Sequence, residues 1–166
     1  MTDTITRILV PVDFSADSQR ALEYAARLAA RLGASIELLH VIDDSFLTGP
    51  WSAELHVPNA SDFLGRLKTE AALRLGDLQA PLSGSGIPAT VAVDQGQPAR
   101  VIAEHAANGG FDLIAMGTHG RTGLSHILLG SVAERVVRLA PCPVLTLRGS
   151  LVEARPGVEA AAAASA

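Results

Sequence analysis

The part of this sequence best suited to binding chemistry is residues 117–131, GTHGRTGLSHILLGS. Three glycines recur every third residue from Gly117, and Gly130 directly precedes Ser131. An apolar run precedes the stretch and an amphipathic run follows it, which predicts a loop between a strand and a helix. Glycine lets a backbone approach a ligand closely, and the unpaired amides of a helix N-terminus attract anions. We therefore predict a cradle for a phosphate-bearing ligand, with the Ser131 hydroxyl bonding a phosphate oxygen or a metal.

A simpler interpretation of this stretch stays open, namely a glycine-rich turn in which Ser131 only caps the helix. Two commoner phosphate motifs do not fit. A P-loop needs a lysine before its serine or threonine, and the only lysine, Lys68, lies in another segment. A dinucleotide fingerprint needs glycines directly after the first strand, where this chain has PVDFS.

Apolar periodicity predicts strands that alternate with helices along the chain. We expect strands at residues 7–13, 35–42, 87–93, 111–117 and 142–148. We expect helices at 18–33, 62–81, 98–110 and 131–140, and a long loop at 43–58. This order predicts an α/β fold, a parallel sheet with helices on both faces.

Ligands bind such sheets beyond the carboxyl ends of the strands. The residues at these positions are Asp13, residues 41–44, Gly96 and the loop that begins at Gly117.

Bulk composition restricts the class of protein. The chain has 166 residues, 48% of them hydrophobic, and a formal net charge of -4 without a cluster of basic residues, which argues against a nucleic-acid partner. A single cysteine, Cys142, excludes an intrachain disulfide and a cysteine-based metal site. The N-terminal apolar run is too short for a signal peptide, and no run is long enough to span a membrane. We expect a cytoplasmic protein with no membrane insertion, a domain at residues 1–148 and a disordered alanine-rich tail at 149–166.

The spacing of the glycine stretch resembles that of a known family. Gly117-Thr-His-Gly120, nine residues, then Gly130-Ser131 matches the G-x2-G-x9-G-[S/T] motif of the universal stress protein family, in its ATP-binding branch. RILVPVDFSADSQRAL resembles the family's first strand and turn, LLHV its second strand, and residues 111–147 its C-terminal signature. The resemblance covers roughly residues 5–148. It implies a Rossmann-like, adenine-nucleotide-binding three-layer sandwich with five parallel strands.

The resemblance also implies a binding role for particular residues. Asp13 would bond the ribose or the adenine edge, the Val41 backbone would meet the adenine, and Gly117 would admit the ribose. Gly120, Gly130, Ser131 and the Val132 amide would hold the phosphates. The whole candidate nucleotide-binding set is Pro11, Val12, Asp13, Val41, Met116, Gly117, His119, Gly120, Arg121, Gly130, Ser131 and Val132. For Asp13, capping of the first helix is the structural alternative.

No catalytic constellation is readable in the sequence, since no lysine lies near the loop and no base is placed to orient a water. The resemblance therefore implies a small ATP-binding regulatory protein of the stress response, a nucleotide-dependent switch with little or no hydrolysis. ATP, ADP or AMP would bind, with the accompanying metal, Mg or Mn, left open. A homodimer would form through the last strand near Val144 to Leu147, and nucleotide would control a protein partner. The alternatives are a slow nucleotide hydrolase, a cyclic-AMP binder and a nucleotide-free dimeric accessory protein.

Overall fold

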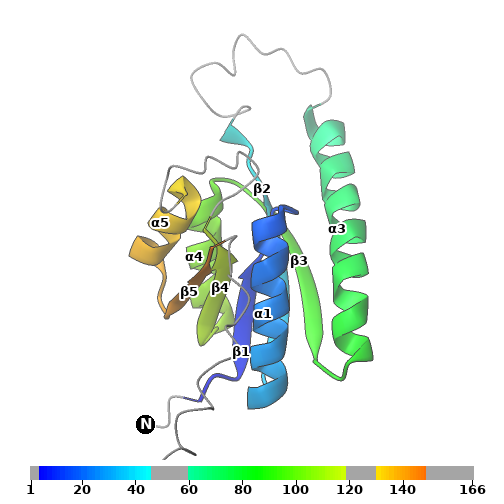
Figure 1. The fold of residues 1–166 in the computed structure, drawn as a ribbon. Coiled ribbons are helices and arrows are strands. Elements are labelled where there is room, and N and C mark those ends of the chain that lie inside the picture. The colour runs from blue at the N-terminus through cyan, green and yellow to red at the C-terminus, as the bar shows by residue number, and fades with distance from the viewer. Residues whose placement is uncertain (1–3, 46–59, 119–129, 149–166) are drawn as a thin grey trace, which may run out of the picture.

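A five-stranded parallel sheet lies at the centre of the protein, with the strands in the order β3-β2-β1-β4-β5 (Figure 1). The structure is a computed structural model that describes residues 4–45, 60–118 and 130–148. The strands are β1 (Arg7–Pro11), β2 (Ser35–Ile42), β3 (Ala89–Gln95), β4 (Leu113–Gly117) and β5 (Val144–Leu147). The helices are α1 (Ala16–Leu32), α3 (Ala60–Gly84), α4 (Pro98–Gly109) and α5 (Ser131–Leu139).

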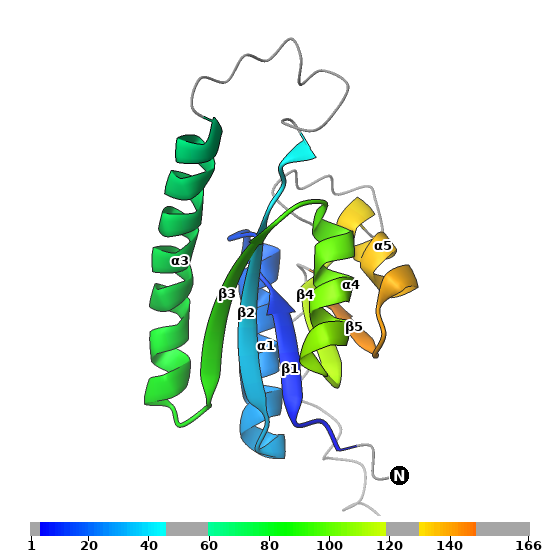
Figure 2. The same ribbon diagram turned by 180° about the vertical axis from the view of Figure 1, so that it is seen from behind.

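Helices cover both faces of the sheet, so the predicted α/β three-layer sandwich is confirmed (Figure 2). On one face, α1 and α3 pack Leu22, Ala25 and Leu75 against the sheet. On the other face, α4 and α5 pack Ile102 and Val136 against it. The strands between these layers are nearly continuous apolar runs, as expected for a parallel sheet that is buried on both sides.

The direction of strand addition reverses between β1 and β4. From β1 the chain adds β2 and β3 on one side, then crosses over to place β4 on the other side of β1, with Ile8 opposite Leu113. The helices that follow these two strands, α1 and α5, pack on opposite faces of the sheet, and open α/β sheets bind their ligands at such a point. Asp13 follows the end of β1 and Gly117 ends β4, so both predicted site segments lie at this reversal.

Local sequence sets the limits of the helices around the sheet. Ser15 caps α1, where its side chain accepts a hydrogen bond of 3.2 Å from the Ser18 amide. Gly33 ends α1 and Gly110 ends α4, each in the left-handed conformation that glycine adopts without strain. These three boundaries agree with the sequence prediction to within two residues.

The predicted end of the second helix at Pro81 is wrong, because α3 continues through Pro81 to Gly84. Proline removes one backbone donor and disfavours a helix interior, but burial and hydrogen bonds in the turn that follows stabilise the continued helix. Leu82 is buried, and Ser85 donates to the Pro81 carbonyl from both its amide, at 3.1 Å, and its hydroxyl, at 2.9 Å. The third strand accordingly begins at Ala89, two residues later than predicted.

Three predicted segments fall wholly or mainly outside the described residues: most of the 43–58 loop, the centre of the glycine stretch at 119–129, and the 149–166 tail. The domain limits therefore stay a prediction. Among the residues that the structure does describe, no helix combines the length and the apolar character that a membrane crossing requires.

Candidate functional site

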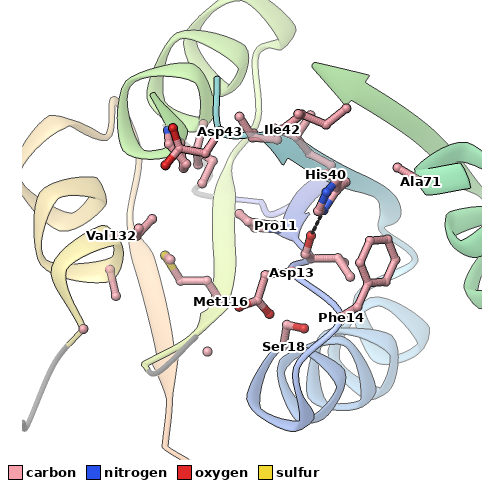
Figure 3. A pocket seen from close by; sticks show the side chains of 18 of the residues that line it. Pro11, Asp13, Phe14, Ser18, His40, Ile42, Asp43, Ala71, Met116 and Val132 are labelled. Atoms are coloured by element: carbon pink, nitrogen blue, oxygen red, sulfur yellow. Dashed lines mark hydrogen bonds between the residues drawn. The ribbon is translucent and has the colours of Figure 1, made fainter. Parts of the chain in front are cut away.

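A cavity of about 860 Å³ opens at the carboxyl edge of the sheet, at the strand-order reversal (Figure 3). Its volume lies within the range of about 300–1,000 Å³ that is usual for small-molecule sites. The cavity floor is formed by the residues that end or follow β1, β2 and β4. Its walls come from α3 on one side and from α4 and α5 on the other.

Nine of the twelve candidate residues are described, and all nine line this one cavity. They are Pro11, Val12, Asp13, Val41, Met116, Gly117, Gly130, Ser131 and Val132. They come from three strand ends and one helix start that lie far apart in the sequence. The other three candidates, His119, Gly120 and Arg121, lie outside the described residues, so their role stays a prediction.

The cavity extends over the sheet edge and reaches both faces of the sheet. Leu39, Val41 and Met116 belong to the apolar cluster on the α4–α5 face, and Ile102 of α4 faces them. Val12 and Phe14 belong to the cluster on the α1–α3 face. The first group, an apolar slot lined by these four residues, is suited to a flat ring, and Gly130 and Ser131 at the N-terminus of α5 line the same cavity.

The N-terminus of α5 supplies the polar end of the cavity. Gly130 is the N-cap in an extended conformation, φ −66° and ψ 154°, and among the described residues no side chain caps the helix. Ser131 is the first helical residue, so it does not occupy the N-cap position itself. The helix dipole and the unpaired amides of this first turn favour an anion. The Gly130 amide itself donates to the Thr118 carbonyl at 2.7 Å, which anchors α5 to the end of β4.

Asp13 stands in the turn between β1 and α1 and supports the helix cap without being the cap. Its Oδ1 accepts hydrogen bonds from the Ser15 amide at 3.0 Å and from the Ser15 hydroxyl at 2.5 Å. No described residue donates to its other carboxylate oxygen. Val12, just before it, is fixed at both ends: its amide donates to the Leu39 carbonyl at 2.8 Å and its carbonyl accepts from His40 Nδ1 at 2.7 Å. Asp13 is thus held at the cavity with one oxygen available to a donor.

Gly117 has a packing role that the sequence did not suggest. A β-carbon at this position would lie 2.8 Å from the Asp17 carbonyl carbon and 2.9 Å from the Asp17 Cβ. The resemblance implied that Gly117 admits a ribose, whereas the contact shown here is with the first turn of α1.

Within the described ranges, no group of three or more histidine, cysteine or acidic side chains has the arrangement of a metal site. Three acidic residues, Asp13, Asp43 and Glu70, line the cavity, each from a different element or turn.

Comparison with known proteins identifies the family. The sequence model of the universal stress protein family matches residues 4–148. The chain belongs to this family. Universal stress protein MJ0531 of Methanocaldococcus jannaschii is 35% identical over 143 residues, which cover 86% of this chain and 81% of that protein. Universal stress protein YxiE of Bacillus subtilis is 32% identical over 145 residues, which cover 86% of this chain and 98% of that protein.

The fold of this universal stress protein also agrees with a solved relative. The structure of MJ0577 from Methanocaldococcus jannaschii superimposes with a TM-score of 0.77 at 30% identity, covering 89% of this chain and 98% of that one. These likenesses confirm the predicted family and the predicted fold class.

Sequence reasoning missed the side of the cavity that faces α3. Phe63, Leu67, Ala71 and Arg74 recur every three or four residues along that helix, and all of them line the cavity. His40 of β2, which was not among the twelve candidates, lines the cavity as well. The helical spacing of the α3 residues was visible in the sequence, but no local signal said that this face of α3 would reach the ends of β1 and β2.

Proposed function

We propose that this universal stress protein binds an adenine nucleotide, ATP first among them, in the cavity at the carboxyl edge of the sheet. The base occupies the apolar slot between Val41 and Met116. The phosphates lie at the N-terminus of α5, against Gly130, Ser131 and the Val132 amide. Asp13 accepts a hydrogen bond from the base or the ribose.

One observation carries this proposal: the same cavity is lined by the apolar slot and by a helix N-terminus that no described side chain caps. A flat apolar ring and a phosphate chain are the two parts of a nucleotide, and the slot and the helix end suit them in turn. Lining by all nine described candidates supports the same ligand, because the candidates were chosen for nucleotide binding.

Two further structures of the fold bear on the ligand. A universal stress protein solved in complex with cAMP has a TM-score of 0.64 at 22% identity. The Archaeoglobus fulgidus protein solved in complex with dAMP has a TM-score of 0.60 at 20% identity. Each likeness establishes a shared fold, and their ligands make a nucleoside monophosphate or cyclic AMP the second candidate ligand for this chain.

We further propose a regulatory role, in which nucleotide occupancy selects a protein partner in the cytoplasm and hydrolysis is slow or absent. A ligand shifts a protein between states only if it binds them with different affinity. The cavity lies between α3 and α5, so a nucleotide that contacts both helices has the means to do this. A homodimer through β5 fits the place of that strand at the edge of the described sheet, where its outer backbone groups would pair with a second copy.

The test begins with protein purified without added nucleotide. The protein is denatured, any released small molecule is identified by mass spectrometry, and the emptied protein is titrated calorimetrically with ATP, ADP, AMP and cyclic AMP. We expect binding at one site per chain, tightest for ATP. Absence of heat with all four ligands would refute nucleotide binding. Stoichiometric phosphate release from ATP that persists on further purification would refute the switch and favour a hydrolase.

A further inference from the structure

A stack of three side chains lies beside Asp13, on the α1–α3 face of the sheet. The Arg74 guanidinium of α3 lies over the Phe14 ring, 3.8 Å from its centroid. The Phe14 and His40 rings have centroids 4.7 Å apart and an interplanar angle of 38°. His40 Nδ1 then contacts the Val12 carbonyl at 2.7 Å, and since a carbonyl only accepts, this nitrogen carries the proton. Figure 3 shows His40, Phe14 and Asp13 together at one end of the cavity.

Phe14 is the residue on which the stack depends. Its φ of 63° makes it the one non-glycine residue with positive φ among those the structure describes. Bulky side chains rarely adopt this left-handed conformation, and where they do, the surroundings must hold it. Arg74 and His40 both contact the ring and supply part of those surroundings. Strained backbone of this kind concentrates at ligand-binding sites.

The stack fixes the residues on both sides of Asp13. Val12 is held by His40 and by the Leu39 carbonyl, and Phe14 is held by its ring contacts. The Asp13 carboxylate is in turn oriented by Ser15, with Oδ1 engaged. The conformation of this turn therefore sets the position of Asp13 Oδ2, and the stack holds the turn in that conformation.

We propose that Arg74, Phe14 and His40 are positioning residues that set the Asp13 carboxylate for the nucleoside part of the ligand, and that α3 contributes to ligand selectivity through this stack. The proposal rests on the proposed function, because it needs a nucleotide in the cavity. By this proposal α3, which is distant in sequence from the glycine motif, contributes to recognition of the ligand. The phosphate end of the cavity is formed by α5 and does not depend on the stack.

The experiment separates the two ends of the ligand by comparing ATP with inorganic tripolyphosphate. The dissociation constant of ATP is measured by calorimetry, and that of tripolyphosphate by its displacement of ATP. The variants are Phe14→Leu, which removes the ring, and Arg74→Met, which keeps the apolar stem and removes the guanidinium. Phe14→Tyr and Arg74→Lys are the conservative variants. Arg66→Met is the matched control, since Arg66 is an exposed arginine of the same helix that does not line the cavity.

We expect Phe14→Leu to weaken ATP binding about tenfold, which corresponds to the loss of one hydrogen bond to a charged group. The affinity for tripolyphosphate should stay within about twofold of its original value. Arg74→Met should weaken ATP about threefold, in line with an exposed cation–π contact. The conservative variants should retain most of the affinity, and Arg66→Met should change nothing. Because Arg74 is on the surface, its variant tests the stack even if Phe14→Leu unfolds.

The opposite results are equally clear. The variants could instead lower the unfolding midpoint and weaken the binding of ATP and of tripolyphosphate equally, or weaken the binding of neither. Either result would make the stack purely structural and would overturn the proposal. If the unaltered protein binds ATP and the Phe14 and Arg74 variants bind it with the same affinity, this inference alone is wrong. If the unaltered protein binds no nucleotide, the proposed function and this inference both fail.

Discussion

Gly117 at the end of β4 lies so close to α1 that a β-carbon on it would come within 2.8 Å of the Asp17 carbonyl carbon. Gly117 does not have a positive φ, so close packing against α1 is the structural reason for a glycine at this position. We expect Gly117→Ala to push α1 and β4 apart and to destabilise the protein by about 1–3 kcal/mol, the usual cost of overpacking. Urea unfolding measures this change.

Gly76 provides the matched control for this substitution. It lies inside α3, and an added β-carbon there would meet nothing within 4 Å. Alanine favours a helix over glycine by up to about 1 kcal/mol, so Gly76→Ala should leave the protein unchanged or stabilise it. Equal effects of the two substitutions would contradict the packing account of Gly117.

Ser131 should matter to a phosphate ligand more than to the fold. It is the first residue of α5 and is not its N-cap, so Ser131→Ala should change the free energy of unfolding by less than about 0.5 kcal/mol. Loss of its hydroxyl should weaken ATP several-fold. Calorimetric titration and urea unfolding of the same preparation distinguish the two effects. Lower stability with unchanged ATP affinity would mean that Ser131 serves the helix only.

Asp112 ties the start of β1 to the start of β4, at the edge of the sheet away from the cavity. Its Oδ2 accepts hydrogen bonds from the Thr6 amide and the Thr6 hydroxyl, both at 2.8 Å, and from the Arg7 amide at 2.9 Å. The Thr6 backbone bond, followed by the other two bonds, lowers the pKa of the Asp112 carboxyl. The ionised form therefore contributes stability that is complete above the unfolded-state pKa of about 3.9 and is lost as the pH falls through the lower folded-state pKa.

We accordingly expect Asp112→Asn to lower stability by about 1 kcal/mol at pH 7. The difference from the unaltered protein should shrink below about pH 4 and vanish once the native carboxylate is protonated. Urea unfolding between pH 7 and pH 3 measures this dependence. Glu104→Gln, which breaks an exposed pair with Arg100 at 2.7 Å, is the control and should cost less at every pH. A constant difference down to pH 3 would contradict the account.

Cys142 should be a poorly reactive thiol. Partial burial raises its pKa, and the negative charge of Asp112 raises it further, so little thiolate forms near neutral pH. We expect it to react with a disulfide reagent several-fold more slowly than glutathione at pH 7.5. The rate should increase as the pH rises above the ordinary cysteine range, and the unfolded protein in urea should react as fast as glutathione. A rate equal to that of glutathione in the folded protein would contradict the prediction.

Much of the fold followed from patterns within single segments. Buried strands such as Leu113–Gly117 appear as short apolar runs, and Gly33 and Gly110 mark helix ends because only a left-handed residue suits them. The end of α3 was mispredicted for the opposite reason. Burial of Leu82 and the hydrogen bonds of Ser85 carry that helix past Pro81, and both depend on the chain around it.

The site was predictable where its residues follow strands or open a helix, because the parallel order brings those positions to one edge. Asp13, Val41, Gly117 and Gly130 all meet there. Arg74 and Phe14 were not predictable as neighbours, since their contact depends on how the α3 crossover lies over the β1–α1 turn. A cation–π contact between distant segments leaves no spacing pattern in the sequence.

In the proposed complex, the phosphates of a nucleotide lie against Gly130 at the start of α5. Its φ of −66° and ψ of 154° are extended and suit valine, so Gly130→Val should fold at a cost of no more than about 1 kcal/mol. The measurement is the calorimetric titration of this variant and of the unaltered protein with ATP. We predict that the unaltered protein binds ATP and that the folded variant shows no binding, because the new side chain occupies the phosphate position. Equal ATP affinity in the two proteins would contradict the account.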